Sequence, residues 1–128
     1  MIPTEARRKV LVVEDAEATW TVQERTLMAA GFDPLVCTNG VDALQAIAAQ
    51  NFDLVVLDLG LPEVDGWAIL GRLRAEPRTS RVPVLIVTAR DDAETLQRAS
   101  LSGANGYLSK PFDVDKFRNL VNELVDVA

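Results

Sequence analysis

Short runs of apolar, mostly β-branched residues recur along the chain, separated by segments with the punctuation of helices. The runs cover residues 10–13, 35–37, 54–57, 82–87 and 106–108. Their apolar character is continuous rather than alternating, which is typical of strands that are covered on both faces in a parallel sheet. Pro83 fits only at the start of its strand, because proline has no N–H for the ladder.

The segments between the runs predict helices, each delimited by a cap, a glycine or a proline. They cover about residues 18–30 before Gly31, 41–50 after the N-cap Asn39, 67–76 before Pro77, 92–102 before Gly103, and the segment after Asp113. In the last of these, Phe112 and Phe117 occupy the two positions of a hydrophobic staple. A stripe at helical spacing then faces the core: Phe117, Leu120, Val121 and Leu124.

Strands and helices therefore alternate strictly, which predicts an α/β fold: a doubly wound, five-stranded parallel sheet with helices on both faces. We find no linker, repeat or low-complexity segment, so residues 1–128 are expected to form a single domain with its core at about 9–126. In such folds, functional side chains gather at the carboxyl ends of the strands, near the point where the strand order reverses.

Composition narrows the classes of function. The chain has 128 residues, 48% hydrophobic and 25% charged, which indicates a globular domain rather than disorder. Its net charge of −6 argues against direct binding to nucleic acid. No apolar run is long enough to span a bilayer and no export signal precedes the first strand, so we expect no membrane partner.

Two residue types are informative because they are scarce. The chain has no histidine, which excludes a Ser-His-Asp triad, a histidine general base and a histidine-containing zinc site. Cys37 is the only cysteine, so no internal disulfide can form. A reducing, cytoplasmic location fits this cysteine content.

The polar residues at the predicted strand ends point to one chemistry. Glu14 and Asp15 follow the first run, Asp58 the third, Thr88 the fourth and Lys110 the fifth. Three carboxylates in one crevice repel each other unless a cation lies among them, and an open set of hard oxygen ligands suits Mg²⁺. A hydroxyl and an ammonium at the same place suit a phosphoryl group. With no histidine, Asp58 is the best available nucleophile.

Several segments resemble the signatures of response-regulator receiver domains. They are VLDLGLPEVDG at residues 56–66, the pair Glu14-Asp15, the pair Thr88-Ala89, and YLSKPF at 107–112. The segments occur in the family's order and at suitable spacing, and the resemblance covers about residues 9–125. It implies the flavodoxin-like (βα)5 receiver fold and a role in two-component or phosphorelay signalling.

The resemblance also implies a role for each position. Asp58 would accept a phosphoryl group from a phosphohistidine of a histidine kinase or a histidine phosphotransfer protein. Mg²⁺ would be held by Asp15, Asp58 and the backbone carbonyl of Gly60, with Glu14 reached through water. In the family, three groups contact the phosphoryl group, which here would be the side chains of Lys110 and Thr88 and the backbone N–H of Ala89. The Lys110-Pro111 peptide bond would be cis.

Phosphorylation in this family changes a surface that binds other proteins. Thr88 and Tyr107 would act together as the switch, with a static aromatic of the core or rim as the less favoured role for Tyr107. The fourth helix is a candidate two-state element, because Leu96 and Leu101 are its only large apolar residues. The output would go to a downstream protein or to an effector domain outside this chain, with a phosphorylation-dependent homodimer as a further arrangement. Met1 favours a natural start, but a piece of a longer regulator fits as well.

Three rival functions can be weighed on the same residues. A phosphatase with an aspartyl-phosphate intermediate needs a second aspartate two positions after the nucleophile, where this chain has Gly60, so no turnover of an external substrate is expected. A flavodoxin-like FMN carrier needs a hydroxyl- and glycine-rich loop after the first strand, where Glu14 and Asp15 would repel phosphate. The alternative that remains is a receiver-like interaction module that works without phosphorylation.

Overall fold

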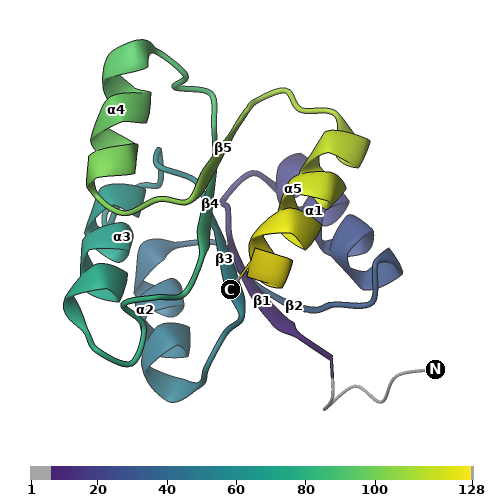
Figure 1. Ribbon diagram of the computed structural model, residues 1–128, viewed down its shortest axis with the longest axis horizontal. Helices are drawn as coiled ribbons and strands as arrows, with labels where there is room; N and C mark the ends of the chain where they lie inside the picture. Colours follow the sequence, from purple (N-terminus) through teal and green to yellow (C-terminus); the bar gives the residue numbers. More distant parts are fainter. Residues whose placement is uncertain (1–6, 128) are drawn as a thin grey trace.

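The computed structural model describes residues 7–127 and shows strands and helices in strict alternation (Figure 1). The strands are β1 (Lys9–Val13), β2 (Asp33–Cys37), β3 (Leu54–Leu57), β4 (Val84–Thr88) and β5 (Gly106–Ser109). The helices are α1 (Glu17–Ala29), α2 (Gly40–Ala49), α3 (Gly66–Ala75), α4 (Ala93–Leu101) and α5 (Val114–Val127).

All strands pair in parallel in one sheet, in the order β2-β1-β3-β4-β5. The chain leaves β1 toward β2 and then returns to the other side of β1, where it continues through β3 to β5. The strand order therefore reverses between β1 and β3, and ligands of doubly wound sheets bind outside the carboxyl ends at that point. The predicted fold class is confirmed.

Successive residues of the inner strands point to opposite faces of the sheet, so each inner strand contributes to two cores. Leu11, Val55 and Ile86 belong to the core under α2, α3 and α4, whereas Val12, Val56 and Val87 belong to the core under α1 and α5. Figure 1 shows the same division, with α2, α3 and α4 on one side of the sheet and α1 and α5 on the other. This double burial explains the continuous apolar runs.

The strand limits differ from the prediction where tertiary contacts decide them. β4 begins at Val84, so Pro83 precedes the strand instead of opening it, although its carbonyl accepts a hydrogen bond from Val55 N–H at 3.0 Å. β2 is longer than predicted because Asp33 and Pro34 pair with the start of β1. Pro34 is tolerated because β2 lies at the edge of the sheet, where the missing N–H breaks no ladder on the open side.

Short polar side chains cap the helices as the sequence indicated. Asn39 accepts a hydrogen bond from Asp42 N–H at 2.8 Å, and Asp113 accepts one from Lys116 N–H at 3.1 Å. The predicted staple is present, with the ring centroids of Phe112 and Phe117 5.4 Å apart. α1 begins and ends one residue earlier than predicted, and Gly31, just after its C-cap, has φ +92°.

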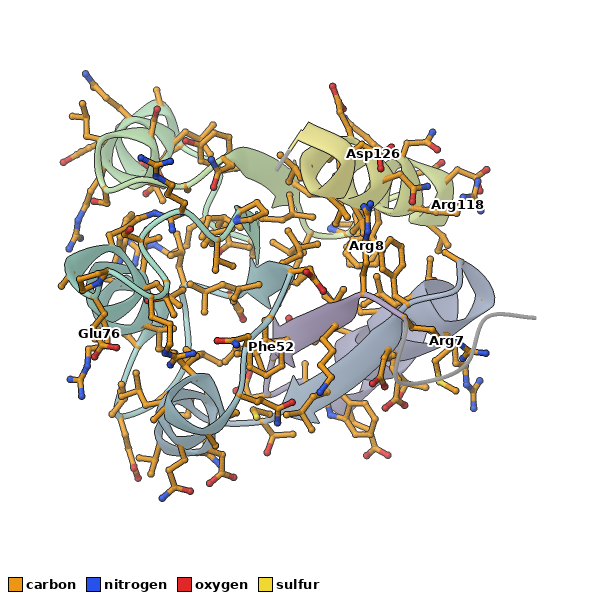
Figure 2. The ribbon with its side chains drawn as sticks, turned by 60° about the horizontal axis from the view of Figure 1, so that its bottom comes forward. Arg7, Arg8, Phe52, Glu76, Arg118 and Asp126 are labelled. Carbon is orange, nitrogen blue, oxygen red and sulfur yellow. The ribbon has the colours of Figure 1, made fainter. Side chains whose placement is uncertain are left out.

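The two ends of the described chain meet at the edge where the strands begin, which comes forward in Figure 2. There the Arg8 guanidinium lies 3.3 Å from the Asp126 carboxylate, and the two side chains are 53% and 75% exposed. An ion pair this exposed adds little stability. No helix within residues 7–127 is long and apolar enough to cross a membrane.

Candidate functional site

The register of the central strands places two carboxylates side by side. Val13 pairs with Leu57 at the ends of β1 and β3, so the next residues, Glu14 and Asp58, leave the sheet together. Their backbones stay aligned, because Asp58 N–H donates to Val13 O at 3.1 Å and Glu14 N–H donates to Cys37 O at 3.1 Å. Both side chains are buried, whereas Asp15 is exposed at the rim.

Lys110 reaches the same place from β5. Its N–H donates to Thr88 O at 2.9 Å, which keeps the chain beside the end of β4, and its peptide bond to Pro111 is cis. The Nζ atom lies 3.0 Å from Oδ2 of Asp58 and 2.5 Å from Oε1 of Glu14. A single ammonium therefore bridges carboxylates that lie 44 positions apart in the sequence (58 − 14).

The electrostatics follow from burial. Burial raises the pKa of the Glu14 carboxyl above its ordinary value, although the contact with the Lys110 ammonium and a hydrogen bond from Ala16 N–H act in the opposite direction. Burial alone lowers the pKa of Lys110. Its contacts with Glu14 and Asp58 outweigh that effect, so this pKa lies above its ordinary value and the ammonium stays charged. Three carboxylates and one ammonium leave the site negative.

The donor set fits a hard divalent cation. Glu14, Asp15 and Asp58 each offer a carboxylate oxygen, and these oxygens lie within 4.8 Å of one another. Both oxygens of Glu14 are already engaged, Oε2 by Ala16 N–H at 3.1 Å and Oε1 by Lys110. Asp15 stands at the exposed rim, in a position to act as a direct ligand. Mg²⁺ retains several waters and takes only one or two carboxylates, so it suits this arrangement.

The segment after Asp58 is held close to the Asp58 carboxylate. Gly60 N–H donates to Oδ1 of Asp58 at 3.1 Å, so both carboxylate oxygens have a partner. Gly66, the first residue of α3, donates to Leu59 O at 3.3 Å, and a Cβ at this position would lie only 2.3 Å from the Asp58 carbonyl oxygen. The sequence interpretation placed Gly66 in the turn just before the helix, with the helix start one residue later than observed, and missed this close approach, which only tertiary structure reveals.

The remaining predicted residues lie at the ends of β4 and β5. Thr88 is buried, and its hydroxyl accepts a hydrogen bond from Arg90 N–H at 3.2 Å, while Ala89 is exposed. Tyr107 pairs with Ile86 in the ladder and packs against the core on the α3 side. Its hydroxyl oxygen is buried without a hydrogen-bond partner within the described part of the chain. Within the described residues, Tyr107 therefore forms no hydrogen bond to the carboxylate cluster.

Comparison with known proteins agrees with this geometry. A family model described as the response regulator receiver domain matches residues 10–122. A probable transcriptional regulator, ycf29, of Pyropia yezoensis is 33% identical over 116 residues, which are 91% of this chain and 52% of that protein. The DNA-binding dual master transcriptional regulator RpaA of Synechocystis is 37% identical over 118 residues, covering 91% of this chain and 48% of the relative. The chain thus spans about half the length of these relatives.

Solved structures give the same picture. The receiver domain of the Francisella response regulator 1452 superposes with a TM-score of 0.86 at 32% identity, covering 94% of this chain and 98% of that one. The receiver domain of the sensor histidine kinase PA1611 from Pseudomonas aeruginosa has a TM-score of 0.86 at 27% identity, covering 94% of this chain and 99% of that one. That structure holds a magnesium ion coordinated in its active-site cleft.

Proposed function

Because the chain belongs to the response regulator receiver domain family, we propose that it works as a phosphorylation-activated signalling domain with Asp58 as the acceptor. The observation that carries the proposal is the position of Lys110 Nζ, 3.0 Å from Asp58 and 2.5 Å from Glu14, in a crevice that Asp15 completes. The five strands and helices within residues 9–127 support one receiver unit.

The donor that suits Asp58 is a phosphohistidine on a histidine kinase or a histidine phosphotransfer protein. A carboxylate oxygen of Asp58 attacks the phosphorus, the P–N bond breaks, and its electron pair returns to the imidazole of the donor. This chain itself has no histidine, so the phosphohistidine that donates the group lies outside it. Asp15, Asp58 and the Gly60 carbonyl would hold Mg²⁺, with Glu14 reached through water, and the bound ion would supply positive charge that offsets the charge of the phosphoryl group.

Once Asp58 carries the phosphoryl group, the residues around it have new acceptors. Phosphorylation adds roughly −1.5 to −2 charge. Lys110 already lies at the acceptor and can pair with a phosphoryl oxygen, and the Thr88 hydroxyl and Ala89 N–H stand at the end of the neighbouring strand. Movement of Thr88 toward that group would exchange its bond from Arg90 N–H for a charge-assisted one. Tyr107 is the residue expected to change its rotamer when Thr88 moves, because its hydroxyl has no hydrogen bond to break within the described residues.

The output is a change in protein–protein binding, to a downstream protein or an effector domain, and a phosphorylation-dependent homodimer is one form of it. The net charge of −6 disfavours binding of this chain to a phosphate backbone. Gly60 offers no acid to drive turnover of an external phosphate ester, so the aspartyl phosphate is a signal rather than a catalytic intermediate.

The proposal is tested by intact-mass spectrometry after incubation with acetyl phosphate or phosphoramidate, with and without Mg²⁺. We expect a gain of one phosphoryl group that requires Mg²⁺ and is absent in Asp58→Asn. Asp53→Asn is a matched control, because Asp53 caps the start of the sheet through Lys9 N–H at 2.8 Å and lies at the edge opposite the site. A folded protein that gains no mass under any of these conditions would instead be an interaction module that works without phosphorylation.

A further inference from the structure

α4 is held to the rest of the molecule by small side chains. Among its described residues, only Thr95 and Ala99 are buried, Leu96 is half-buried, and Leu101 is 82% exposed. The sequence interpretation expected a thinly anchored helix, because Leu96 and Leu101 are its only large apolar residues, and the exposure of Leu101 makes the anchoring weaker still. Burial of such small groups contributes little apolar stabilisation, so modest forces can change the position of α4.

One end of α4 is nevertheless tied to α3. The guanidinium of Arg74 donates to Gly103 O at 3.0 Å and to Oδ1 of Asn105 at 3.0 Å, just beyond the C-terminus of α4. It also donates to the carbonyls of Thr79 and Ser80, at 3.3 and 3.1 Å. The C-terminal end of α4 is therefore fixed at the edge of the sheet away from Asp58, and movement of the helix must pivot about that end.

A second contact between α3 and α4 lies between this anchor and the acceptor. The Cζ atom of Arg98 is 3.9 Å from the centroid of the Trp67 ring, a cation–π contact. Trp67 is half-buried and packs against the core cluster on that face of the sheet. Arg98 is exposed apart from this contact, so Trp67 is what holds its head group.

Trp67 is connected to the acceptor through its neighbour in the chain. The Gly66 N–H donates to Leu59 O at 3.3 Å. A Cβ atom at position 66 would lie only 2.3 Å from the carbonyl oxygen of Asp58. The first turn of α3 therefore packs directly on the backbone of Asp58 and Leu59. A shift of that backbone is passed to Trp67 with no flexible side chain in between.

We propose that the Trp67–Arg98 contact couples the chemical state of Asp58 to the position of α4, as a route separate from Thr88 and Tyr107. The inference rests on the proposed function of Asp58 as acceptor. In the arrangement described, Gly60 N–H and Lys110 occupy both oxygens of Asp58, which is possible only for the unmodified carboxylate. A phosphoryl group on Oδ1 breaks the bond from Gly60 N–H, and the loss of this bond is what would shift the segment on which Trp67 rests.

Coupling of this kind is reciprocal. The contact of Arg98 with Trp67 stabilises the conformation in which Asp58 is unmodified. Removal of the Arg98 side chain therefore makes the conformation with modified Asp58 easier to reach. A cation–π contact at a largely exposed site contributes about 0.5–1 kcal/mol, which corresponds to a change of about two- to fivefold in an equilibrium constant. Binding of a reversible phosphoryl mimic should therefore tighten by that factor when Arg98 is truncated.

The test uses beryllofluoride with Mg²⁺ as the mimic and Trp20→Phe as the background, so that Trp67 is the only tryptophan. We expect Trp67 emission to change on titration, and the change to be lost in Arg98→Ala. By calorimetric titration, Arg98→Ala should bind beryllofluoride about two- to fivefold more tightly. Gln97→Ala, an exposed neighbour on α4, is the matched control and should leave both readouts unchanged.

Intact mass after acetyl phosphate treatment of the same samples separates this inference from the function on which it rests. If Asp58 gains a phosphoryl group while Trp67 emission stays constant and Arg98→Ala binds beryllofluoride like the parent, the coupling is wrong and the acceptor function stands. If the parent neither gains mass nor binds beryllofluoride, the acceptor function fails and the coupling fails with it.

Discussion

The ammonium of Lys110 lies 2.5 Å from the carboxylate of Glu14, a side chain that is only 1% exposed. The same ammonium lies 3.0 Å from Asp58. Lys110 therefore has two roles in one position. It compensates the negative charge of the buried Glu14, and it lies beside the Asp58 carboxylate, where it can pair with a phosphoryl group on that residue.

The first role predicts a specific pH dependence of stability. The pKa of Lys110 is raised in the folded protein, so its contribution to stability is fully present below the ordinary value of 10.5 and is lost as the pH rises through the raised value. Lys110→Met should lower the free energy of unfolding at neutral pH by about 3 kcal/mol, because it leaves Glu14 buried without a counter-charge. Urea unfolding from neutral to alkaline pH measures both effects.

The difference in the free energy of unfolding between the parent and Lys110→Met should shrink as the pH rises above 10.5. Lys116→Met removes an exposed lysine of α5 and should give a curve parallel to that of the parent. A constant difference between parent and Lys110→Met at all pH values would contradict the assignment of the ion pair.

Gly66 is predicted to be intolerant of any side chain. A Cβ at this position meets backbone atoms, the Asp58 carbonyl oxygen at 2.3 Å and Leu59 Cα at 2.6 Å, which cannot move aside without displacing the acceptor. Gly66→Ala should lower the free energy of unfolding by about 3 kcal/mol and slow phosphorylation of Asp58. Gly71, in the same helix, has open space around its Cα, so Gly71→Ala should stabilise the protein by about 0.5–1 kcal/mol. Equal effects of the two substitutions would show that the close approach is not real.

Arg74 is predicted to stabilise far more than its neighbour Arg72. Arg74 is partly buried and satisfies acceptors of Thr79, Gly103 and Asn105, whereas Arg72 forms an i,i+4 pair with Glu76 in which the side chains are 59% and 42% exposed. Arg74→Met should cost about 3 kcal/mol, since several acceptors lose their donor. Arg72→Met should change stability by less than about 0.5 kcal/mol. Thermal and urea unfolding of the two variants measure these changes. A similar loss of stability in both variants would contradict the role of Arg74 at the α3–α4 junction.

Gln23 is predicted to be a destabilising residue. It faces the interior of the fold from α1, is 1% exposed, and its Oε1 has no hydrogen-bond partner within the described residues. Gln23→Leu should raise the free energy of unfolding by about 1–2 kcal/mol, because an apolar group of similar size needs no partner. Gln45→Leu, on the exposed side of α2, is the control and should change stability little. A loss of stability in Gln23→Leu would mean that the amide makes a bond through water.

The sequence was sufficient for the fold and for the assembly of the site, because both depend on local patterns. Continuous apolar runs imply strands buried on two faces, and parallel strands bring their carboxyl ends to one edge, so Glu14, Asp58 and Lys110 had to converge. The caps at Asn39 and Asp113 are likewise local, since donor and acceptor lie within one helical turn.

What the sequence did not show depends on how helices pack across the fold. The contact of Arg98 with Trp67 joins positions 31 residues apart, and the bonds from Arg74 to Gly103 and Asn105 span 29 and 31 residues. No periodicity distinguishes Arg74 from the exposed Arg72. A polar residue within α1 is expected at the surface, so the burial of Gln23 was also missed. Glu63, at φ +60°, adopts a left-handed conformation that its residue type does not indicate.

The central claim, that Asp58 receives the phosphoryl group, is tested most directly by locating the modification. After treatment with acetyl phosphate and Mg²⁺, reduction with borohydride converts an aspartyl phosphate to homoserine, and peptide sequencing by mass spectrometry identifies the residue. We predict homoserine at position 58 alone, with Glu14 and Asp15 intact and with no product when Mg²⁺ is removed by a chelator. Homoserine at position 15, or an even distribution over the acidic residues, would contradict the geometry on which this account rests.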